Sequence, residues 1–262
     1  MHAYANRTPM DPPSARHADF DLAAAYAVEA ERARWRLARG HAAIGRKVGF
    51  ANKAMWRVLK LETLLWAHMY DDTVQYGVDG RASVSVARMF APKIEPEIVF
   101  KLKRPIEATD AEAVLDAVEW LALGFEIIDC VYPEWKFQPV DFVAAFGFHA
   151  ALIVGPPRRV EPFEIPSLVN ELSQFKVRLL KNGQLVEEGS GKKVLGNPAL
   201  CLGELAAGLL RQPGAEPLAG GDLVSSGTLT TSVPIAPGET WGAEVDGIDL
   251  APLTLHTIGP VI

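Results

Sequence analysis

The sequence predicts an α+β protein, with helices towards the front of the chain and strands packed behind them. Two observations predict helices: apolar residues recur at steps of three and four over residues 19–39, and a capped helical pattern occupies residues 109–124. A third observation predicts strands, because β-branched and apolar runs alternate with glycine and proline bends at 222–229, 240–245 and 253–258.

The composition is that of a globular chain without a nucleic-acid or membrane partner. With 262 residues, 49% of them hydrophobic, the chain can bury a sizeable core. A net charge of −6 gives no electrostatic footprint for nucleic acid or an anionic membrane. No apolar run approaches the ~20 residues of a membrane span, and the first residues lack the apolar core of a secretion signal. Cys130 and Cys201 show no metal-ligand spacing, so we expect buried thiols and a cytoplasmic protein.

The chain is predicted to form one continuous domain behind a tail. Residues 1–18, rich in Pro, Ala, Arg and His without a period, are expected to be a flexible tail. Residues 19–80 are expected to be an N-terminal helical region, and residues 81–262 a β-rich catalytic region continuous with it.

The N-terminal region is expected to hold two helices around a short strand. The helix at 19–39 can begin at Asp19 or Asp21 and end at Gly40. Residues 44–50 suggest a strand between glycine corners, in which Lys47 points either into a cavity or into solvent. We further expect a helix at 54–65, a loop at 66–80 and a short strand at 84–89.

The most informative stretch is the strand predicted at 92–100, which contains Glu95-Pro96-Glu97. Side chains alternate along a strand, so the two glutamates share one face. Pro96 cannot donate a ladder hydrogen bond, which places the strand at a sheet edge or beside a bulge. The acidic pair allows two interpretations: oxygen ligands for a hard divalent cation, or a solvated edge strand that resists aggregation.

A third acid follows the helix predicted at 109–124. There Thr109 and Glu112 form a capping box, and Gly124 ends the pattern. Residues 125–131 then read as a strongly apolar strand that contains Glu126. Because an unpaired buried carboxylate is very unfavourable, Glu126 requires a partner.

Later segments add a histidine and two turn signals. His149 precedes an apolar strand, and is either a satisfied core histidine or a catalytic group. Asn182-Gly183 predicts a hairpin between 175–180 and 184–188. Asn197 begins a helix that runs to about residue 211. Residues 189–193 resemble a phosphate loop only superficially, because the first glycine of that motif is missing.

Taken together, these motifs resemble the fumarylacetoacetate hydrolase superfamily, in particular its 2-keto-4-pentenoate (2-hydroxypenta-2,4-dienoate) hydratase and 4-oxalocrotonate decarboxylase branch. The resemblance covers about residues 20–262. Five short segments in the same order carry it: 45–50, 94–98, 125–129, 194–198 and 221–228.

The resemblance implies a fumarylacetoacetate-hydrolase-like mixed β-sandwich roll with N-terminal helices, assembled as a homo-oligomer. It implies a Mg²⁺ or Mn²⁺ site whose ligands are Glu95, Glu97 and Glu126. Lys47 would serve in catalysis and, with Thr228 and Thr230, in substrate binding. The bound metal would act as a Lewis acid on a small 2-oxo or 2-hydroxydienoic acid from aromatic or steroid ring cleavage.

The sequence departs from the family at one place. Hydratases of the family carry an Asp-Asn-Ala-Ser type run where this chain has the aromatic residues and His149 of segment 144–149. This replacement raises the expectation that His149 contributes to catalysis. It also suggests either a larger, more apolar substrate or a loss of activity.

Four functions are therefore weighed. The first is a metal-dependent lyase that hydrates a 2-hydroxypenta-2,4-dienoate-type substrate to a 4-hydroxy-2-oxo acid. The second is decarboxylation of a 4-oxalocrotonate-type vinylogous 2-oxo diacid, and the third is hydrolysis of an acylpyruvate C–C bond. The fourth is a 2-oxo acid binding protein without turnover.

Overall fold

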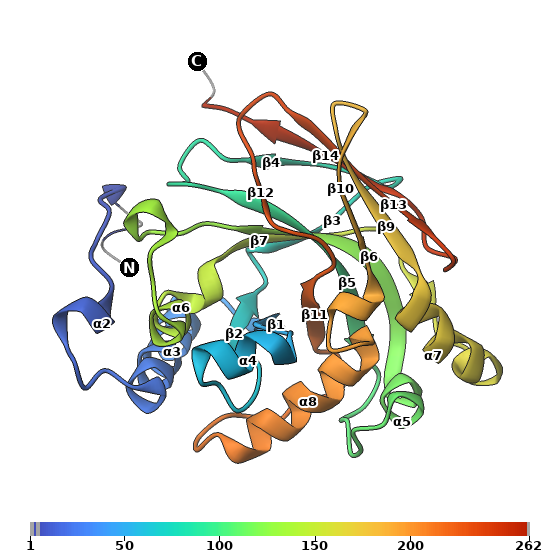
Figure 1. Ribbon diagram of the computed structural model, residues 1–262, viewed down its shortest axis with the longest axis horizontal. Helices are drawn as coiled ribbons and strands as arrows, with labels where there is room; N and C mark the ends of the chain where they lie inside the picture. Colours follow the sequence, from blue (N-terminus) through green and yellow to red (C-terminus); the bar gives the residue numbers. More distant parts are fainter. Residues whose placement is uncertain (1–2, 4–5, 261–262) are drawn as a thin grey trace.

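The structure is a computed structural model that describes residue 3 and residues 6–260. Its larger sheet is mixed and runs through the middle of the molecule (Figure 1). In order of pairing, the strands are β2 (Leu65–Tyr70), β1 (Ala43–Gly49), β11 (Leu223–Thr228), β5 (Lys93–Leu102), β6 (Val118–Ile128), β7 (His149–Val154) and β3 (Val74–Tyr76). Two short strands pair beside this path, β12 (Val233–Pro234) with β5 and β8 (Arg158–Arg159) with β6.

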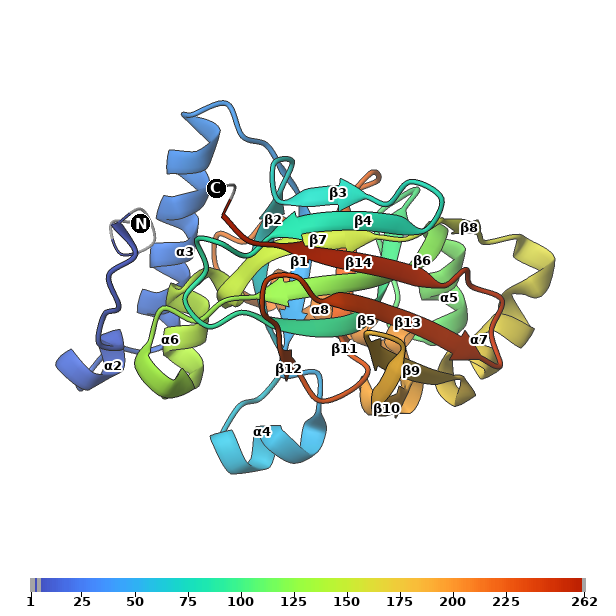
Figure 2. The same cartoon turned by 90° about the horizontal axis from the view of Figure 1, so that it is seen from above.

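A smaller sheet lies on the side of the larger sheet away from α8 (Figures 1 and 2). Its strands, in order of pairing, are β10 (Gln184–Ser190), β9 (Lys176–Lys181), β13 (Thr240–Asp246), β14 (Leu253–Ile258) and β4 (Arg81–Ser85). The two sheets with flanking helices confirm the predicted α+β class.

The helices flank the larger sheet and cover its edges (Figure 1). The α-helices are α2 (Pro13–Arg16), α3 (Leu22–Leu37), α4 (Lys53–Leu59), α5 (Ala111–Asp116), α6 (Pro139–Ala144), α7 (Ile165–Gln174) and α8 (Pro198–Arg211). Single 3-10 turns occur at Pro133–Trp135, Phe146–Phe148, Pro162–Glu164 and Gly191–Lys193. In Figure 2, α4 stands apart from the remaining elements, and none of its residues is buried.

The larger sheet curls because its two outermost strands are consecutive in the chain. β2 and β3 end the pairing order on opposite sides, yet only residues 71–73 separate them. So few residues span little more than ~10 Å, which forces the two edges towards one another. The turn thereby carries Thr73 against β7, where its carbonyl accepts from Leu152 N–H at 2.8 Å.

One face of the curled sheet is apolar over part of its length and polar over the rest. Met69, Val99 and Leu152 form a buried cluster there. On β5, Glu97 lies two residues before Val99 and therefore points to the same face. The opposite face, with Ile98 and Phe100, joins the main core.

Several predicted elements are confirmed with nearly the predicted bounds. Asp21 caps α3 by accepting from Ala24 N–H at 2.8 Å, and Asn197 caps α8 through Ala199 N–H at 2.8 Å. The hairpin of β9 and β10 turns at Asn182 (φ 50°) and Gly183 (φ 79°), both with the positive φ that a type I′ turn requires. Strands β11, β13 and β14 form the predicted C-terminal β region.

The loop predicted at 66–80 is wrong. This segment contains all but the first residue of β2 and the whole of β3, and every residue of β2 is buried. A strand covered on both faces loses the alternation of apolar and polar residues by which strands are recognised. The region 19–80 therefore contributes three strands, β1 to β3, to the larger sheet.

The helix predicted at 109–124 is also wrong in its length and cap. Asp110, not Thr109, caps α5 by accepting from Ala113 N–H at 3.0 Å, and the helix ends at Asp116. β6 begins two residues later and runs through Gly124. The apolar residues that suggested one face of a helix are instead buried along a strand between β5 and β7.

Three smaller predictions are revised. The helix expected at 54–65 is the shorter α4, which ends at Leu59 because Lys60 adopts a left-handed conformation (φ 56°). The strand expected at 84–89 is β4, which begins and ends earlier. Within the predicted tail, α2 is held by Ser14, whose backbone N–H and hydroxyl donate to Asp141 at 2.8 and 2.6 Å. Residues 1, 2, 4 and 5 of that tail lie outside the described residues.

Two further findings concern the cysteines and the helices. Cys130 and Cys201 are both buried free thiols, as expected. Across the described ranges, every helix is too short or too polar to cross a bilayer.

Candidate active site

Three carboxylates converge on the polar part of the curled sheet. Glu95 and Glu97 come from β5 and Glu126 from β6, where Glu95 and Glu126 are directly paired across the two strands. One carboxylate oxygen from each residue lies within 4.8 Å of the others. The sequence predicts the face that Glu95 and Glu97 share, while the β5–β6 register adds Glu126.

Pro96 is accommodated by an irregularity in the β11–β5 pairing. The register shifts between Ser225 and Thr228 on β11, opposite Val99 and Glu97. Of the two locations predicted for Pro96, the bulge is confirmed and the sheet edge is wrong, because β5 lies between β11 and β6.

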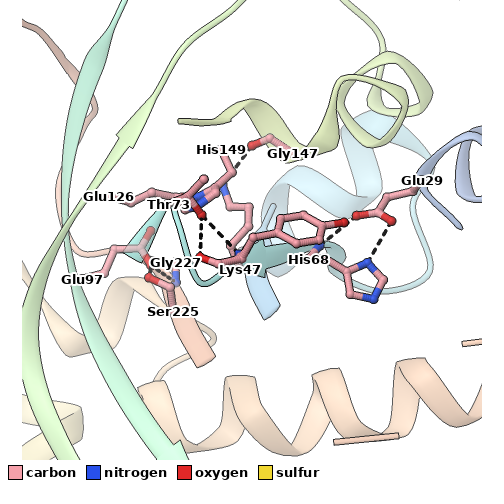
Figure 3. A network of polar contacts seen from close by, with 11 residues as sticks. Glu29, Lys47, His68, Thr73, Glu97, Glu126, Gly147, His149, Ser225 and Gly227 are labelled. Atoms are coloured by element: carbon pink, nitrogen blue, oxygen red, sulfur yellow. Dashed lines mark hydrogen bonds and ion pairs between the residues drawn. The ribbon is translucent and has the colours of Figure 1, made fainter. Parts of the chain in front are cut away.

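Lys47 extends from β1 into the acidic cluster and is buried (Figure 3). Its Nζ lies 2.8 Å from Glu126 Oε2 and donates to the Gly147 carbonyl at 3.1 Å. Desolvation by itself lowers the pKa of Lys47, but Glu126, Glu95 and Glu97 together outweigh it and raise the pKa above its ordinary value. Lys47 is therefore a buried ammonium that faces the three carboxylates.

His149, at the start of β7, is enclosed with both ring nitrogens engaged (Figure 3). Nδ1 lies 2.9 Å from Glu126 Oε1 and Nε2 lies 3.0 Å from the Thr73 hydroxyl. Burial lowers the pKa of His149 even though Glu126 opposes the shift, which favours a neutral ring. A neutral ring satisfies both contacts when Nδ1–H donates to Glu126 and Nε2 accepts from the Thr73 hydroxyl, which then gives up its 3.0 Å hydrogen bond to the Tyr70 carbonyl.

Glu126 thus carries its charge between two partners. Burial alone raises the pKa of Glu126, but Lys47 and His149 reverse that effect and lower it below its ordinary value. Oε1 is hydrogen-bonded to His149 Nδ1. Oε2 forms the ion pair with Lys47 but has no well-directed hydrogen bond within the described residues. One oxygen of this buried carboxylate therefore retains capacity for a further ligand.

Glu97 is held by β11. Oε2 accepts from the Ser225 hydroxyl at 2.5 Å and from Gly227 N–H at 2.8 Å. Gly227 has a φ of 102°, which favours glycine, and its N–H can approach Glu97 in this conformation. Burial, reinforced by Glu126 and Glu95, raises the pKa of Glu97 well above its usual range.

Glu95 keeps part of its surface exposed to solvent. Desolvation raises the pKa of Glu95 to about 7, opposed by Lys47 and reinforced by Glu126. The three carboxylates carry three negative charges when all are ionised, and Lys47 balances one of them. The raised pKa values of Glu95 and Glu97 reflect this excess negative charge.

An all-oxygen donor set of this kind fits a hard divalent cation. Mg²⁺, Mn²⁺ and Ca²⁺ prefer carboxylate oxygens, and a dication would balance the two charges that Lys47 leaves. The incompletely bonded Glu126 Oε2 and the raised pKa of Glu97 both fit a missing positive charge. The residues present therefore fit the metal that the sequence motifs imply.

Thr228 ends β11 beside Glu97, Thr230 follows the strand, and the hydroxyls of both bond to nearby backbone carbonyls. Thr228 is paired with Glu97 across β11 and β5. Its hydroxyl donates to the Thr230 carbonyl at 3.2 Å, and the Thr230 hydroxyl donates to the Thr231 carbonyl at 2.9 Å. Substrate binding by these two threonines stays a prediction.

The sequence analysis missed Thr73, Ser225, Gly227 and Gly147. Thr73 lay in a supposed loop, and its role depends on the pairing of β3 with β7. Ser225 and Gly227 belong to the segment 221–228 that carries the family resemblance, which was the available signal. Gly147 lies in the 144–149 segment, in which the aromatic residues and His149 are the more conspicuous departures from the family pattern.

Replacing Gly147 by alanine is expected to lower turnover about tenfold or more. A Cβ at this position would lie 2.7 Å from Lys47 Cδ and 3.0 Å from Ala67 Cβ, and the backbone has a φ of 63°. The new methyl group would displace Lys47 from Glu126, and misplacement of a positioned group by about 1 Å can reduce turnover about 100-fold. Steady-state turnover and thermal unfolding measure the effect.

The matched control is Gly183→Ala in the β9–β10 turn. Gly183 has a similar φ of 79° with nothing within 4 Å of its would-be Cβ, so it carries the backbone strain alone. Both variants should lose stability, and only Gly147→Ala should lose activity. Equal activities of the two variants would show that Gly147 does not position Lys47.

A second group of potential metal ligands is more exposed. Asp71 and Asp72 lie in the turn after β2 and His41 lies just before β1, and their ligand atoms also lie within 4.8 Å of one another. Asp72 is already paired with Arg36, and His41 Nδ1 is 3.5 Å from both acids. This group belongs to the surface and lacks a buried ammonium such as Lys47.

Known proteins are similar to this chain in sequence and in fold. Residues 53–255 match the family described as Fumarylacetoacetate (FAA) hydrolase C-terminal. The 2-hydroxyhexa-2,4-dienoate hydratase of Comamonas testosteroni is 29% identical over 236 residues, which cover 88% of this chain and 85% of that protein. The 4-oxalocrotonate decarboxylase of Pseudomonas sp. (strain CF600) is 31% identical over 232 residues, which cover 88% of this chain and 84% of that protein.

A solved structure extends the likeness to three dimensions. The 4-oxalocrotonate decarboxylase from Pseudomonas putida G7, complexed with magnesium and adipate, is 28% identical and superposes with a TM-score of 0.87 over 98% of this chain and 94% of that chain. With a family match over residues 53–255 and relatives that are similar over most of its length, the chain belongs to the fumarylacetoacetate (FAA) hydrolase C-terminal family.

Proposed function

We propose that this protein is a divalent-metal-dependent lyase that hydrates a 2-hydroxypenta-2,4-dienoate-type substrate to a 4-hydroxy-2-oxo acid. The observation that carries the proposal is the buried cluster of Glu95, Glu97 and Glu126 around the Lys47 ammonium. The hydratases and decarboxylases among its relatives support the same class of chemistry.

Glu95, Glu97 and Glu126 would hold Mg²⁺ or Mn²⁺. When bound, the cation supplies Lewis-acid chemistry to the oxygens of a 2-oxo or 2-hydroxydienoic acid. Ser225 and Gly227 fix Glu97, while His149 fixes Glu126. The protein therefore presents these carboxylates in a preset arrangement, which such ligands require.

Lys47 is the group proposed to move a proton. Its raised pKa keeps it an ammonium, so it can donate to C5 of the dienol but is a poor base in the resting protein. Donation at C5, with the 2-hydroxyl proton passing back to Lys47, gives the isomeric 2-oxo-3-enoate tautomer. Water then adds at C4, with a proton gained at C3, so that the net change is the addition of one water molecule.

His149 is proposed as a positioning residue. Both of its nitrogens are engaged by Glu126 and Thr73, and its side chain is fully enclosed. Its proposed role is to orient Glu126. Thr228 and Thr230 are proposed to contact the substrate, on the basis of the pairing of Thr228 with Glu97.

A specific observation favours decarboxylation as the second candidate function. The relative from Pseudomonas sp. (strain CF600) and the solved structure with a TM-score of 0.87 are both 4-oxalocrotonate decarboxylases. In that reaction a vinylogous 2-oxo diacid loses CO₂, and a proton must then be supplied to the resulting dienolate. The same Lys47 ammonium could supply it.

A spectrophotometric assay with Mg²⁺ or Mn²⁺ separates these functions. Loss of 2-hydroxypenta-2,4-dienoate absorbance without CO₂ release is the expected result, and CO₂ release from 4-oxalocrotonate would support the decarboxylase. If metal and oxalate bind but neither substrate is consumed, the lyase proposal is wrong and the protein only binds 2-oxo acids. An acylpyruvate is the third substrate, and its cleavage would support C–C bond hydrolysis.

Metal affinity is expected to rise with pH between about 6 and 8. The pKa of Glu95 is about 7 and that of Glu97 is raised, so at the lower pH a cation must displace protons from these carboxyls. As the pH rises past the pKa of Glu95, that carboxyl is already ionised, and binding becomes tighter with fewer protons released. Titration calorimetry in two buffers of different ionisation enthalpy measures both the metal affinity and the number of protons released.

An affinity that is constant over this range, with no proton release, would contradict the pKa assignments of Glu95 and Glu97.

Assembly as a homo-oligomer and residence in the cytoplasm are proposed alongside the function. The two buried free thiols support a reducing compartment. Light scattering of the purified chain tests the assembly.

A further inference from the structure

A cleft of about 660 Å³ lies behind the sheet, away from the acidic cluster. It is bounded by α3, by the β1–β2 edge of the larger sheet and by residues 212–216 after α8. Trp66 and His68 line it from β2, whereas Ala67 between them is paired with Lys47 on the other face. The volume is in the range of small-molecule sites, and the cleft is separate from the proposed active site.

The floor of the cleft carries a histidine fixed by a buried carboxylate. Glu29, fully buried on α3, accepts from His68 N–H at 2.8 Å and lies 2.8 Å from His68 Nδ1. A proton on Nδ1 satisfies this second contact, which leaves the Nε2 lone pair unused in the neutral ring. Figure 3 shows this second ring nitrogen pointing away from Glu29.

Nε2 of His68 belongs to a residue that lines the cleft and has no protein hydrogen-bond partner within the described residues. Only 9% of His68 is exposed, and among residues 6–260 no hydrogen bond to Nε2 is formed. Because His68 lines the cleft, a donor group on a bound ligand could reach this nitrogen.

The remaining walls are aromatic or apolar. Tyr26 and Trp66 are stacked at 4.8 Å between ring centroids, and the α3 side of the cleft is lined by alanines such as Ala27 and Ala30. Small side chains leave room for a planar ring.

The charges around the cleft disfavour an anion. Glu29 and Glu216 are both among its lining residues. Arg34, the basic residue in the lining, is already 2.7 Å from Glu31. Arg46, opposite His68 in the β1–β2 pairing, lies 5.3 Å from the Trp66 ring centroid and interacts with Glu29 and Glu216. A carboxylate ligand would therefore meet two acidic residues, while both of these arginines are already engaged by acidic groups.

From these features we propose that the cleft binds a small neutral phenol, whose hydroxyl donates to His68 Nε2 and whose ring lies among Trp66, Tyr26 and the α3 alanines. The site goes beyond the proposed lyase activity and does not depend on it. Neutral charge, one donor and a flat apolar body are the three properties that the cleft selects.

Ligand-observed NMR and calorimetry with phenol, toluene and benzoate test the proposal on the full chain. Phenol should bind saturably at one site, and toluene should bind about threefold to tenfold more weakly, as expected for the loss of one hydrogen bond. Benzoate should bind more weakly than phenol. Tighter binding of benzoate, equal binding of toluene, or no saturable binding of phenol would each overturn the proposal.

Two matched variants locate the site. Ala30→Phe fills the cleft with a ring and should abolish phenol binding. Val28→Phe adds the same bulk on α3 at a position that is 40% exposed and outside the cleft lining, so it should leave binding unchanged. Both variants should keep the wild-type rate in the dienol assay, because neither residue belongs to the acidic cluster. Phenol binding that survives in Ala30→Phe would place the site elsewhere.

His68→Phe tests the hydrogen bond itself. The variant should bind phenol and toluene equally, because it lacks Nε2. It also deprives Glu29 of a donor, so thermal unfolding is recorded in parallel; if it does not fold, the ranking of probes and the Ala30/Val28 pair decide the proposal. A folded variant that still prefers phenol would overturn the assignment to His68.

Discussion

Glu126→Gln is expected to reduce metal-dependent turnover by at least about 100-fold. The substitution keeps the shape of the side chain but removes the charge that faces both Lys47 and the proposed cation. It also changes the partner of His149 Nδ1 from a carboxylate to an amide. Because Glu126 belongs to the proposed metal site and contacts both Lys47 and His149, this single change affects all three.

The fold of Glu126→Gln should remain largely intact. Removing one partner of a buried ion pair can destabilise a protein by about 3–5 kcal/mol, but Glu95 and Glu97 still face Lys47 and reduce that loss. Circular dichroism and thermal unfolding monitor the fold, while turnover and metal titration monitor the site. Glu119→Gln, at the other end of β6, is the matched control and should behave as wild type. Unchanged turnover in a folded Glu126→Gln would remove Glu126 from the site.

Lys47→Met should lower turnover about 100-fold or more while leaving metal affinity intact. Methionine preserves length and apolar contacts, so the buried position of Lys47 remains filled. The ammonium lies 2.8 Å from Glu126 Oε2, where it competes with a dication for the same oxygen. Its removal should therefore preserve or tighten metal binding, although the proposed proton donor is lost.

The informative result is a fall in turnover without a fall in metal affinity. Turnover is measured with the dienol substrate at saturating metal, and metal affinity by calorimetry without substrate. Lys101→Met, on β5 beyond the acidic pair, controls for loss of a lysine and should change neither quantity. An undiminished rate in Lys47→Met would show that Lys47 is not the proton donor. Weakened metal binding with a normal rate would show instead that Lys47 supports the metal site.

Much of the site follows from local sequence pattern. Alternation along β5 is enough to place Glu95 and Glu97 on one face, and the apolar surroundings of Glu126 require it to have a partner. Likewise, caps and turns depend on neighbouring residues alone, which is why the starts of α3 and α8 and the turn at Asn182 were predictable.

Where several sheet neighbours bury a segment, local pattern fails. Every residue of β2 is buried, so Leu65–Tyr70 shows neither a helical nor a strand period. In β6, apolar residues at nearly every position satisfied a helical template as well as a strand. Tertiary pairing, which the sequence does not display, decided both segments.

The contacts that complete the site are the least visible in the sequence. Thr73 reaches His149 only because the turn after β2 joins the two outermost strands of one sheet. Ser225 reaches Glu97 across 128 positions of sequence through the β11–β5 pairing. Such positions become predictable only once the register of the larger sheet is known.

The most direct test of the central claim is the location of Mn²⁺ by anomalous X-ray diffraction from crystals soaked in MnCl₂. Our account predicts one strong peak within bonding distance of carboxylate oxygens of Glu95, Glu97 and Glu126. A peak at His41, Asp71 and Asp72 instead, with none between β5 and β6, would contradict it.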